Sequence, residues 1–296
     1  MDKGELHHYT GMAVADVERV YEASKEKLLA LAAQQHHPNA NTPTLTSHNL
    51  LAITLHWLRR KPTYNELSHL YPHSGFFWHL MVRKVVAALD GCISSRFVPS
   101  LASNAPTAVR FPNVKIIVDT TFVPLPKTPF IPADYHKKSP TKAAWKYEIA
   151  CDFNHHIISV SKGYHGGAHD MRIIRESGLL DQSSSTALIM GDKGYRGQLG
   201  IVVPASKKAK VSREVQQLED EKQRGHELQA ERAAIECMNK RVKEWAVVRT
   251  AWEGRRDPVE FFDSVMRVVC ALTNVILCDH PLWTRDHHRA DGASVS

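Results

Sequence analysis

Apolar side chains recur at three- and four-residue spacing through the first third of the chain, which is the period of an amphipathic helix. The pattern predicts one helix over residues 13–35 and, after a break rich in asparagine and proline, three shorter ones. These shorter helices are expected over residues 48–60, 64–70 and 75–90, capped at their N-termini by Ser47, Thr63 and Ser74. Two short helices followed by a longer one that bears basic residues predict a helix-turn-helix.

A second pattern begins at Val114, where a nearly continuous β-branched run to Asp119 predicts a strand covered on both faces. Residues 145–153 and 156–162 are expected to form two strands joined by a tight turn, which predicts a hairpin. Further helices are expected over residues 170–177, 213–245 and 258–277, and further strands over residues 187–190, 201–204 and 247–252. This order of elements predicts an α/β fold in which helices pack on a mixed sheet.

Changes of composition along the chain suggest where its parts begin and end. With 296 residues, the chain is long enough to bury a full hydrophobic core. A stretch rich in proline and asparagine, without periodicity, separates the helical pattern from the strand pattern. The expected segments are an N-terminal helix (1–40), a small all-α helix-turn-helix module (41–92), a linker (93–113), an α/β catalytic domain (114–278) and a disordered tail (279–296).

The charge balance favours a polyanionic partner. Lysine and arginine outnumber aspartate and glutamate by 38 to 31, which gives a net charge of +7 and an isoelectric point near 9.1. The five cysteines show no CxxC spacing, so free thiols in a reducing compartment are expected, without disulfides or a zinc cage. No apolar run approaches the roughly 18 residues that cross a membrane, so the sequence predicts a soluble intracellular protein without a membrane partner.

Three acidic residues stand in unlike local settings: Asp119 and Asp192 follow apolar strand-like runs, and Glu236 lies in a highly charged helical stretch. Each has an ordinary explanation alone, as a turn cap, a glycine-rich turn residue and a surface ion-pair partner respectively. A carboxylate at the end of a buried strand is costly unless something compensates its charge, and a bound cation would do so. Together with the basic composition, these acids suggest a metal-dependent enzyme that acts on nucleic acid.

Four segments follow one another along the chain, and three of them contain these acidic residues. They are an apolar strand ending in Asp119-Thr-Thr, a loop ending in Gly-Gly-Ala-His169-Asp170, a strand leading into Gly-Asp192-Lys-Gly-Tyr, and a helix with Arg232-x3-Glu236-x6-Lys243. The stretch from Val114 to Leu277 therefore resembles the catalytic domain of DDE transposases, of the bacterial insertion-sequence type and the related PIF/Harbinger type. The pattern departs at Gln229, where the insertion-sequence type often has a tyrosine.

The resemblance implies an RNase H-like fold, in which strand ends hold Asp119 and Asp192 and a helix brings Glu236 to them. These three residues are then the expected catalytic residues and the expected ligands of two Mg²⁺ or Mn²⁺ ions. Residues expected to contact DNA phosphates beside them are Lys193, Arg232, Asn239 and Lys243, and His169 and Asp170 are expected to support the site.

The activity implied by this family is cleavage and transfer of DNA strands by a homo-oligomeric transposase. The helix over residues 75–90 would then enter the major groove of double-stranded DNA, with Ser74, His79, Arg83 and Lys84 as candidate contacts. Two alternatives stay open: a domesticated, transposase-derived host nuclease, and a DNA-binding protein without transposition activity. The expected location is the nucleus in a eukaryotic host and otherwise the cytoplasm.

Overall fold

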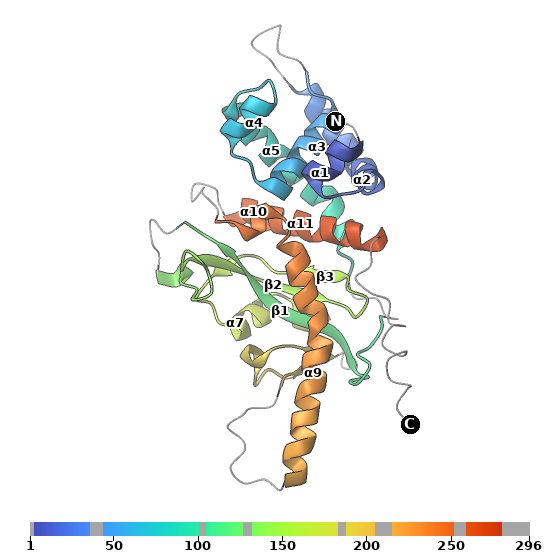
Figure 1. The fold of residues 1–296 in the computed structure, drawn as a ribbon, viewed down its shortest axis with the longest axis vertical. Helices are drawn as coiled ribbons and strands as arrows, with labels where there is room; N and C mark the ends of the chain where they lie inside the picture. Colours follow the sequence, from blue (N-terminus) through green and yellow to red (C-terminus); the bar gives the residue numbers. More distant parts are fainter. Residues whose placement is uncertain are drawn as a thin grey trace.

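The structure, a computed structural model, describes residues 3–35, 44–100, 105–126, 132–182, 188–204, 215–251 and 259–279. A layer of helices from the N-terminal part of the chain lies above a sheet, and helices α10 and α11 lie between the two (Figure 1). Helix α9 crosses the sheet and extends beyond it, away from the helical layer (Figure 1). Of the tail predicted to be disordered, only Asp279 falls within the described residues.

The helical layer contains the four helices that the sequence predicts and one that it does not. Its members are α1 (Lys3–Thr10), α2 (Val14–Ala33), α3 (Ser47–Arg60), α4 (Tyr64–Leu70) and α5 (Gly75–Leu89). Thr63 forms a capping box with Glu66 at the start of α4, and the Ser74 side chain accepts a hydrogen bond from the backbone N–H of Phe77, as expected for caps. The cap of α3 was predicted one residue late, because Thr46 and not Ser47 accepts from the Asn49 backbone N–H.

The last helix of this layer does not stop at its predicted end, so helical structure continues into the first residues of the predicted linker. After α5 the chain continues through a π-helical segment, η1 (Asp90–Ser94), and a last turn, α6 (Ser95–Phe97). The carbonyl of Phe97 accepts a hydrogen bond from the side-chain amide of Asn274 on α11 (Val259–Asp279). The chain therefore leaves the helical layer already attached to the helix below it.

A mixed sheet forms the lower part of the molecule, as predicted. Its strands are β1 (Val114–Pro124), β2 (Ala144–Cys151), β3 (Ile157–Val160), β4 (Tyr164–His165), β5 (Leu188–Met190) and β6 (Ile201–Val202). The strand order is β3-β2-β1-β5-β6, with β4 pairing with β2. Strands β1, β2 and β3 are antiparallel, whereas β5 and β6 run parallel to β1. This arrangement is consistent with an RNase H-like fold.

Strand β1 is longer than the sequence suggests, and this changes the setting of Asp119. The strand continues through the Asp-Thr-Thr segment and pairs with β2 as far as Pro124. Its pairing with β5, however, ends at Ile117. The sequence predicted Asp119 at the end of its own strand. The structure places it within β1, just beyond the end of the neighbouring parallel strand β5.

Helices cover both faces of the sheet and produce two hydrophobic clusters. On one face, β1 residues such as Ile117 pack in the cluster that also contains residues of α9 (Val215–Val242) and α11. On the other face, Ile116 and Val118 pack with residues of α7 (Asp170–Glu176) and α8 (Leu179–Gln182). Because β1 is covered on both sides, its apolar run is nearly continuous, as a buried central strand requires.

One predicted strand is in fact a helix. Residues 247–252 were expected to form a strand because of their valines, but the structure has a helical turn, α10 (Ala246–Arg249). Ala246, Val247 and Val248 are all buried there, and α10 packs against α3 and β1. Burial on several sides favours apolar residues in either conformation, so tertiary packing overrides the β propensity of valine here.

Helix α11 joins the two layers through a single core. It contacts α2 and α5 above and β3 and α9 below, and the hydrophobic cluster that contains it also contains residues from α1 to α5. The expectation that no segment has the length and apolar character of a membrane span was wrong, because Val259–Cys278 reaches a mean hydropathy of 1.7 over an 18-residue window. That window is 72% buried inside the fold, as in the core helix of a globular protein.

Candidate active site

Asp119 lies at the centre of the site, where β1 passes under helix α9. One carboxylate oxygen accepts a hydrogen bond from the backbone N–H of Thr120 at 2.9 Å, and the other accepts one from the side-chain amide of Asn239 on α9 at 3.1 Å. Burial raises the pKa of Asp119 from its ordinary value of 3.8 to about 6. The positive charge of Arg232 opposes this rise, and the charges of Asp192 and Asp170 add to it.

Asp192 approaches from the neighbouring strand, immediately after β5 and Gly191. Its side chain accepts a hydrogen bond from the backbone N–H of Gly194 at 2.6 Å, and this contact starts the short 3-10 turn η3 (Lys193–Tyr195). A Cβ atom added to Gly194 would collide with Asp170 Oδ2 and lie 2.8 Å from Asp192 Oδ1. Glycine at position 194 therefore lets two carboxylates lie against one turn of backbone.

Asp170 completes a group of acids that we call the carboxylate cluster (Asp119, Asp170 and Asp192). The ammonium group of Lys146 lies 2.6 Å from Asp170 Oδ1, and the Thr120 hydroxyl donates to the same oxygen at 3.1 Å. Lys146 had no predicted role in the site, although it falls in the segment resembling the family. The neighbouring His169 caps α7 by accepting from the backbone N–H of Met171, so its role is to fix the helix that carries Asp170.

Helix α9 presents polar side chains to this cluster. Arg232, Asn239 and Lys243 follow one another at seven- and four-residue spacing, so they lie on one stripe of the helix. The Arg232 Nε atom and the Asn239 Oδ1 atom are buried without a hydrogen-bond partner within the described part of the chain. Such atoms usually have partners, so these two atoms leave unmet hydrogen-bonding capacity at the site.

Lys243 stands at the end of this stripe nearest the helical layer. Its ammonium group lies 3.9 Å from the centroid of the Phe122 ring, a cation–π contact. Burial lowers the pKa of Lys243, and the charge of Asp119 opposes that shift. A half-buried lysine over a ring is held in place, so it can present its charge to one point of a bound anion.

Glu236, the third acid that the sequence predicts, lies on the same helix but is exposed to solvent. Helical spacing puts it between Arg232 and Asn239, on the edge of the stripe. The α9 side chain that hydrogen-bonds to Asp119 is Asn239 and not Glu236. The site as described is therefore open on the Glu236 side, and the side chain of Gln229 lies outside the described residues.

A further carboxyl, Glu148 on β2, is buried and supports the turn that carries Asp192, and no motif in the sequence pointed to it. The Tyr195 hydroxyl donates to Glu148 Oε2 at 3.3 Å, and both side chains are almost wholly buried. Burial raises the pKa of Glu148 to about 7, and the charge of Asp170 adds to the rise. Because Tyr195 ends the η3 turn, Glu148 fixes the turn from beneath.

We expect Glu148→Gln to stabilise the protein at alkaline pH. The folded-state pKa of Glu148, about 7, lies above its ordinary value of 4.5, so ionisation costs stability as pH rises through this window. The amide keeps the size and the contact with Tyr195 but has no charge to bury. Urea unfolding at pH 5 and pH 8 would measure this, with a gain of roughly 2 kcal/mol at pH 8 that shrinks at pH 5. An equal gain at both pH values would contradict the explanation.

The residues present suit a hard divalent cation. Carboxylate and amide oxygens are the donors that Mg²⁺ and Mn²⁺ prefer, and the carboxylate cluster supplies them on two rigid strands and a helix start. Within the described residues, no group of three or more His, Cys, Asp or Glu side chains is placed so that it could hold a metal ion. The fit is therefore one of donor chemistry alone.

The other predicted contact residues lie apart from the carboxylate cluster or face solvent. Lys193 is exposed on the η3 turn. On α5, Lys84 is exposed, His79 packs edge-on against Tyr64, and the Arg83 guanidinium lies 4.4 Å from the Phe261 ring of α11. The hydroxyl oxygen of Ser74 caps α5, because it accepts a hydrogen bond from the backbone N–H of Phe77.

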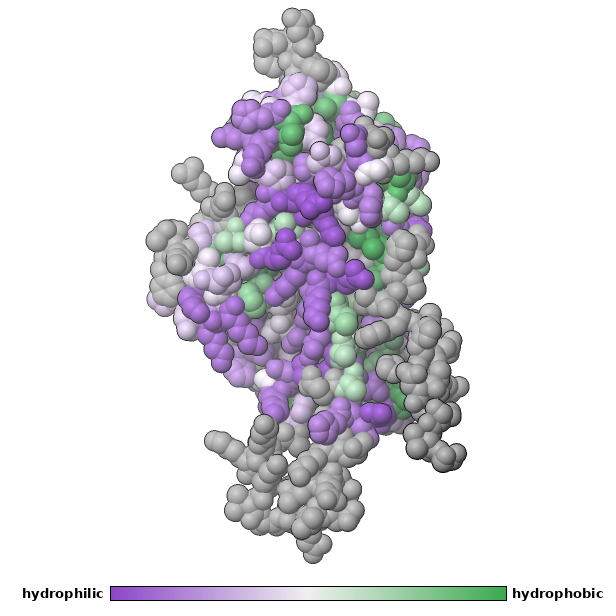
Figure 2. Space-filling view, in the orientation of Figure 1, coloured by the Kyte–Doolittle hydropathy of each residue, from purple (hydrophilic) through white to green (hydrophobic). Residues whose placement is uncertain are grey.

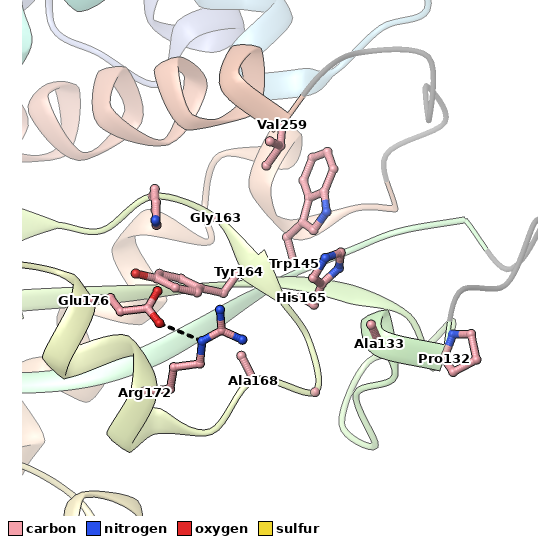
Figure 3. Close-up of a pocket in the computed structure, with 12 residues that line it drawn as sticks. Pro132, Ala133, Trp145, Gly163, Tyr164, His165, Ala168, Arg172, Glu176 and Val259 are labelled. Atoms are coloured by element: carbon pink, nitrogen blue, oxygen red, sulfur yellow. Dashed lines mark hydrogen bonds and ion pairs between the residues drawn. The ribbon is translucent and has the colours of Figure 1, made fainter.

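A hollow of about 650 Å³ adjoins the site on the far side of the loop that ends at Asp170. Trp145, Tyr164 and His165 line it, together with the ion pair of Arg172 and Glu176 (Figure 3). The carbonyl of Ala168, another lining residue, accepts a hydrogen bond from the Lys146 ammonium group at 3.0 Å. One loop thus separates this hollow from the carboxylate cluster.

Carboxylates gathered on the central strands of such a sheet, beneath a helix that bears cations, are the arrangement of a nuclease of the RNase H-like class. The chain belongs to the family described as DDE superfamily endonuclease, whose model matches residues 118–274. The matched stretch contains Asp119, Asp192 and Glu236, and it confirms the predicted DDE-type transposase or endonuclease family without distinguishing the PIF/Harbinger type. No curated protein and no solved structure matched the chain.

Proposed function

We propose that the protein is a metal-dependent DNA endonuclease that cleaves and transfers strands, as a transposase of the PIF/Harbinger or insertion-sequence type does. The observation that carries this proposal is the carboxylate cluster beneath the cationic stripe of α9, in a chain of the DDE endonuclease family. Carboxylates that lie close together favour the binding of a cation, and the net positive charge of the protein favours a polyanionic partner.

In this proposal Asp119 and Asp192 hold divalent ions, with Glu236 as a further ligand from the open side. Such ions, when bound, activate the attacking hydroxyl group and stabilise the oxygen that leaves a phosphodiester. The chain itself supplies orientation: Asn239 fixes one oxygen of Asp119, and Lys146 fixes Asp170. Arg232 and Lys243 bind the non-reacting phosphate oxygens, and the unpartnered Nε of Arg232 suits that role.

The N-terminal layer has the order of helices expected of a helix-turn-helix, and we propose that it binds double-stranded DNA. Lys84 is exposed, while Arg83 is held against Phe261. A transposase must bring two DNA ends together, so we propose a homo-oligomer, located in the nucleus of a eukaryotic host or otherwise in the cytoplasm.

The test is cleavage of plasmid DNA with Mg²⁺ or Mn²⁺, comparing the wild type with Asp192→Ala. We expect cleavage to fall by a factor on the order of 1,000, because the variant lacks an ionic metal ligand. Asp181→Ala is the matched control, since Asp181 is an exposed acid on α8 and its loss should leave cleavage unchanged. Equal cleavage by wild type and Asp192→Ala would sink the nuclease assignment, whereas cleavage without strand transfer would identify a host nuclease.

A further inference from the structure

A polar cleft of about 590 Å³ lies where the N-terminal helices meet α10 and the end of α9. Its charged or titratable lining consists of His7 and His8 from α1, Arg59 and Arg60 from α3, Arg249 from α10, and Glu244. Three arginines against one glutamate leave the cleft with a net charge of +2 before any histidine is protonated. None of these residues belongs to the carboxylate cluster.

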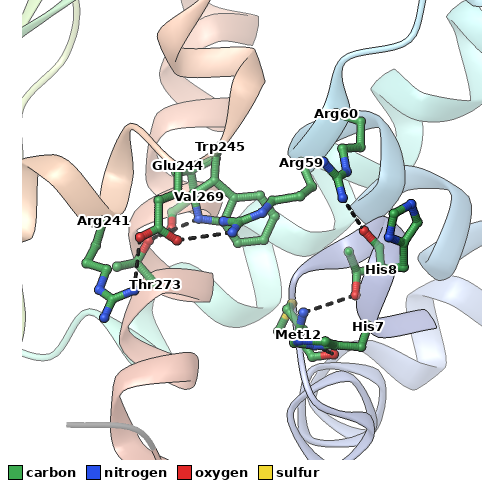
Figure 4. Close-up of polar contacts among 11 residues, drawn as sticks. His7, His8, Met12, Arg59, Arg60, Arg241, Glu244, Trp245, Val269 and Thr273 are labelled. Carbon is green, nitrogen blue, oxygen red and sulfur yellow. Dashed lines mark hydrogen bonds and ion pairs between the residues drawn. The ribbon is translucent and has the colours of Figure 1, made fainter. Parts of the chain in front are cut away.

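Arg59 lines this cleft, and two contacts hold its side chain in place. Its guanidinium group lies 3.0 Å from Glu244 Oε2 and stacks over the Trp245 ring at 5.4 Å (Figure 4). A Cβ atom added to Gly11 would lie 2.5 Å from the Arg59 Nε atom, and Gly11 also has a φ of +68°. Glycine at this position therefore makes room for the arginine. Since Glu244 compensates Arg59, the excess charge of the cleft resides on Arg60 and Arg249.

Arg60 and Arg249 have no carboxylate partner within the described part of the chain, and both are exposed. Arg60 donates one hydrogen bond to the carbonyl of His8 at 2.6 Å, which orients it and leaves its other donors to solvent. The ammonium group of Lys61 donates to the carbonyls of Thr250 and Ala251, so the ends of α3 and α10 are tied together. The helix ends that carry the two arginines are thus held in a fixed relation across the cleft.

The cleft and the carboxylate cluster share one element. At the end of α9, Lys243 contacts Phe122 beside Asp119, and the next residue, Glu244, lines the cleft. The face shown in Figure 2 carries strongly hydrophilic side chains over its middle, between the helical layer and the lower part of the molecule. A polyanion that contacts both places would pass along this junction.

We propose that this cleft binds backbone phosphates of double-stranded DNA that extends from the carboxylate cluster, an inference that rests on the proposed nuclease function. Guanidinium groups match phosphate oxygens in shape and charge. Among the described residues these two have no carboxylate partner, so no ion pair there has to break when a phosphate binds. The competing explanation is that Arg60 and Arg249 only compensate the carbonyl ends of their helices. That explanation predicts a loss of stability and no loss of DNA affinity.

The test is fluorescence anisotropy of a labelled random-sequence duplex of about 30 base pairs, titrated with the full-length chain in EDTA at several salt concentrations. For Arg60→Gln/Arg249→Gln we expect roughly tenfold weaker binding near 0.1 M salt, and a slope of log affinity against log salt smaller by about 2. Lys25→Gln/Lys27→Gln removes two exposed charges from α2 and is the matched control, with little change expected. Glu244→Gln, which removes the one negative charge of the cleft, should strengthen binding.

The outcomes separate this inference from the nuclease assignment. An unchanged affinity and salt slope in Arg60→Gln/Arg249→Gln would overturn the proposal that the cleft binds DNA. An equal effect of the α2 control would overturn it as well. Cleavage is measured on the same preparations with Mg²⁺. If the wild type cleaves nothing but the double variant still loses affinity and slope, the cleft stands and the nuclease assignment falls. If both hold, the double variant cleaves with a raised KM and a kcat near that of the wild type.

Discussion

Replacing Asp119 with asparagine is expected to abolish metal-dependent cleavage and, at the same time, to stabilise the metal-free protein. The activity falls because the amide carries no negative charge for a divalent ion, and the expected loss is at least on the order of 1,000-fold. The fold is not expected to suffer. The new amide oxygen can accept from Thr120. The new amide nitrogen faces the Asn239 amide nitrogen, so the Asn239 amide turns over and accepts with its unpartnered oxygen.

The stability gain follows from the pKa of Asp119. The folded-state pKa, about 6, lies above the ordinary value of 3.8, so the unfolded chain loses its proton first as pH rises. Wild-type stability therefore falls between these two values, and the full cost of about 2 to 3 kcal/mol is present above pH 6. Asp119→Asn avoids that cost.

Urea unfolding in EDTA at pH 8 and pH 5 measures this difference, and about half of the gain should remain at pH 5. Added Mg²⁺ should stabilise the wild type and leave the variant unchanged, because only the wild type has the ligand. Asp181→Asn serves as the control, since it alters an exposed acid. This account would be contradicted if Asp119→Asn cleaved DNA as fast as the wild type, or if the variant were less stable than the wild type at pH 8.

The second large effect is expected on stability from Trp245→Ala, which removes a side chain packed at the junction of the two layers. Trp245 is 1% exposed, its indole N–H donates to the Thr273 hydroxyl at 3.2 Å, and Arg59 stacks over its ring (Figure 4). Truncation removes a large buried side chain and leaves a cavity between α3 and α11. We expect the free energy of unfolding to fall by about 4 kcal/mol, a large part of the total for a typical domain.

Urea unfolding followed by circular dichroism and by tryptophan fluorescence tests this expectation. The two probes should report one transition, because α11 gives both layers a common core. Trp145→Ala is the comparison, since Trp145 is only partly buried at the edge of the side hollow and should cost less than half as much. A loss below about 1 kcal/mol for Trp245→Ala, or separate transitions for the two layers, would show that the layers are independent.

The strongest local signals in the sequence predicted the helices and the sheet correctly. Thr63 and Ser74 mark helix starts because the cap is a contact over three residues, which the sequence contains in full. The turn at Asp152, whose side chain accepts from the backbone N–H groups of Asn154 and His156, gives the hairpin β2–β3 in the same way. The strand predicted over residues 247–252 was wrong, because the conformation of this segment depends on packing against α3, which no local pattern contains.

The site was predictable in part. Asp119, Asp192, Asp170, Arg232, Asn239 and Lys243 were all identified from their motifs, and the structure brings them together. Lys146 belongs to the Lys146-Tyr147 segment that resembles the family, but neither it nor Glu148 was given a role in the site. Their roles arise from the register of β2 against β1 and from burial, not from spacing along the chain. The exposure of Glu236 depends on how α9 is rotated over the sheet, which helical periodicity alone does not fix.

The position of α11 in the chain has a consequence for how the protein is made. Its residues are translated after every strand and every other helix of the described fold, yet α2, α5, β3 and α9 all pack against it. Until Val259–Asp279 leaves the ribosome, both layers have apolar faces without their common partner. The chain therefore has to wait, partly folded, for its last helix. A nascent chain stalled before that helix is expected to depend on chaperones, and a premature stop codon there would remove the helical layer and the nuclease site together.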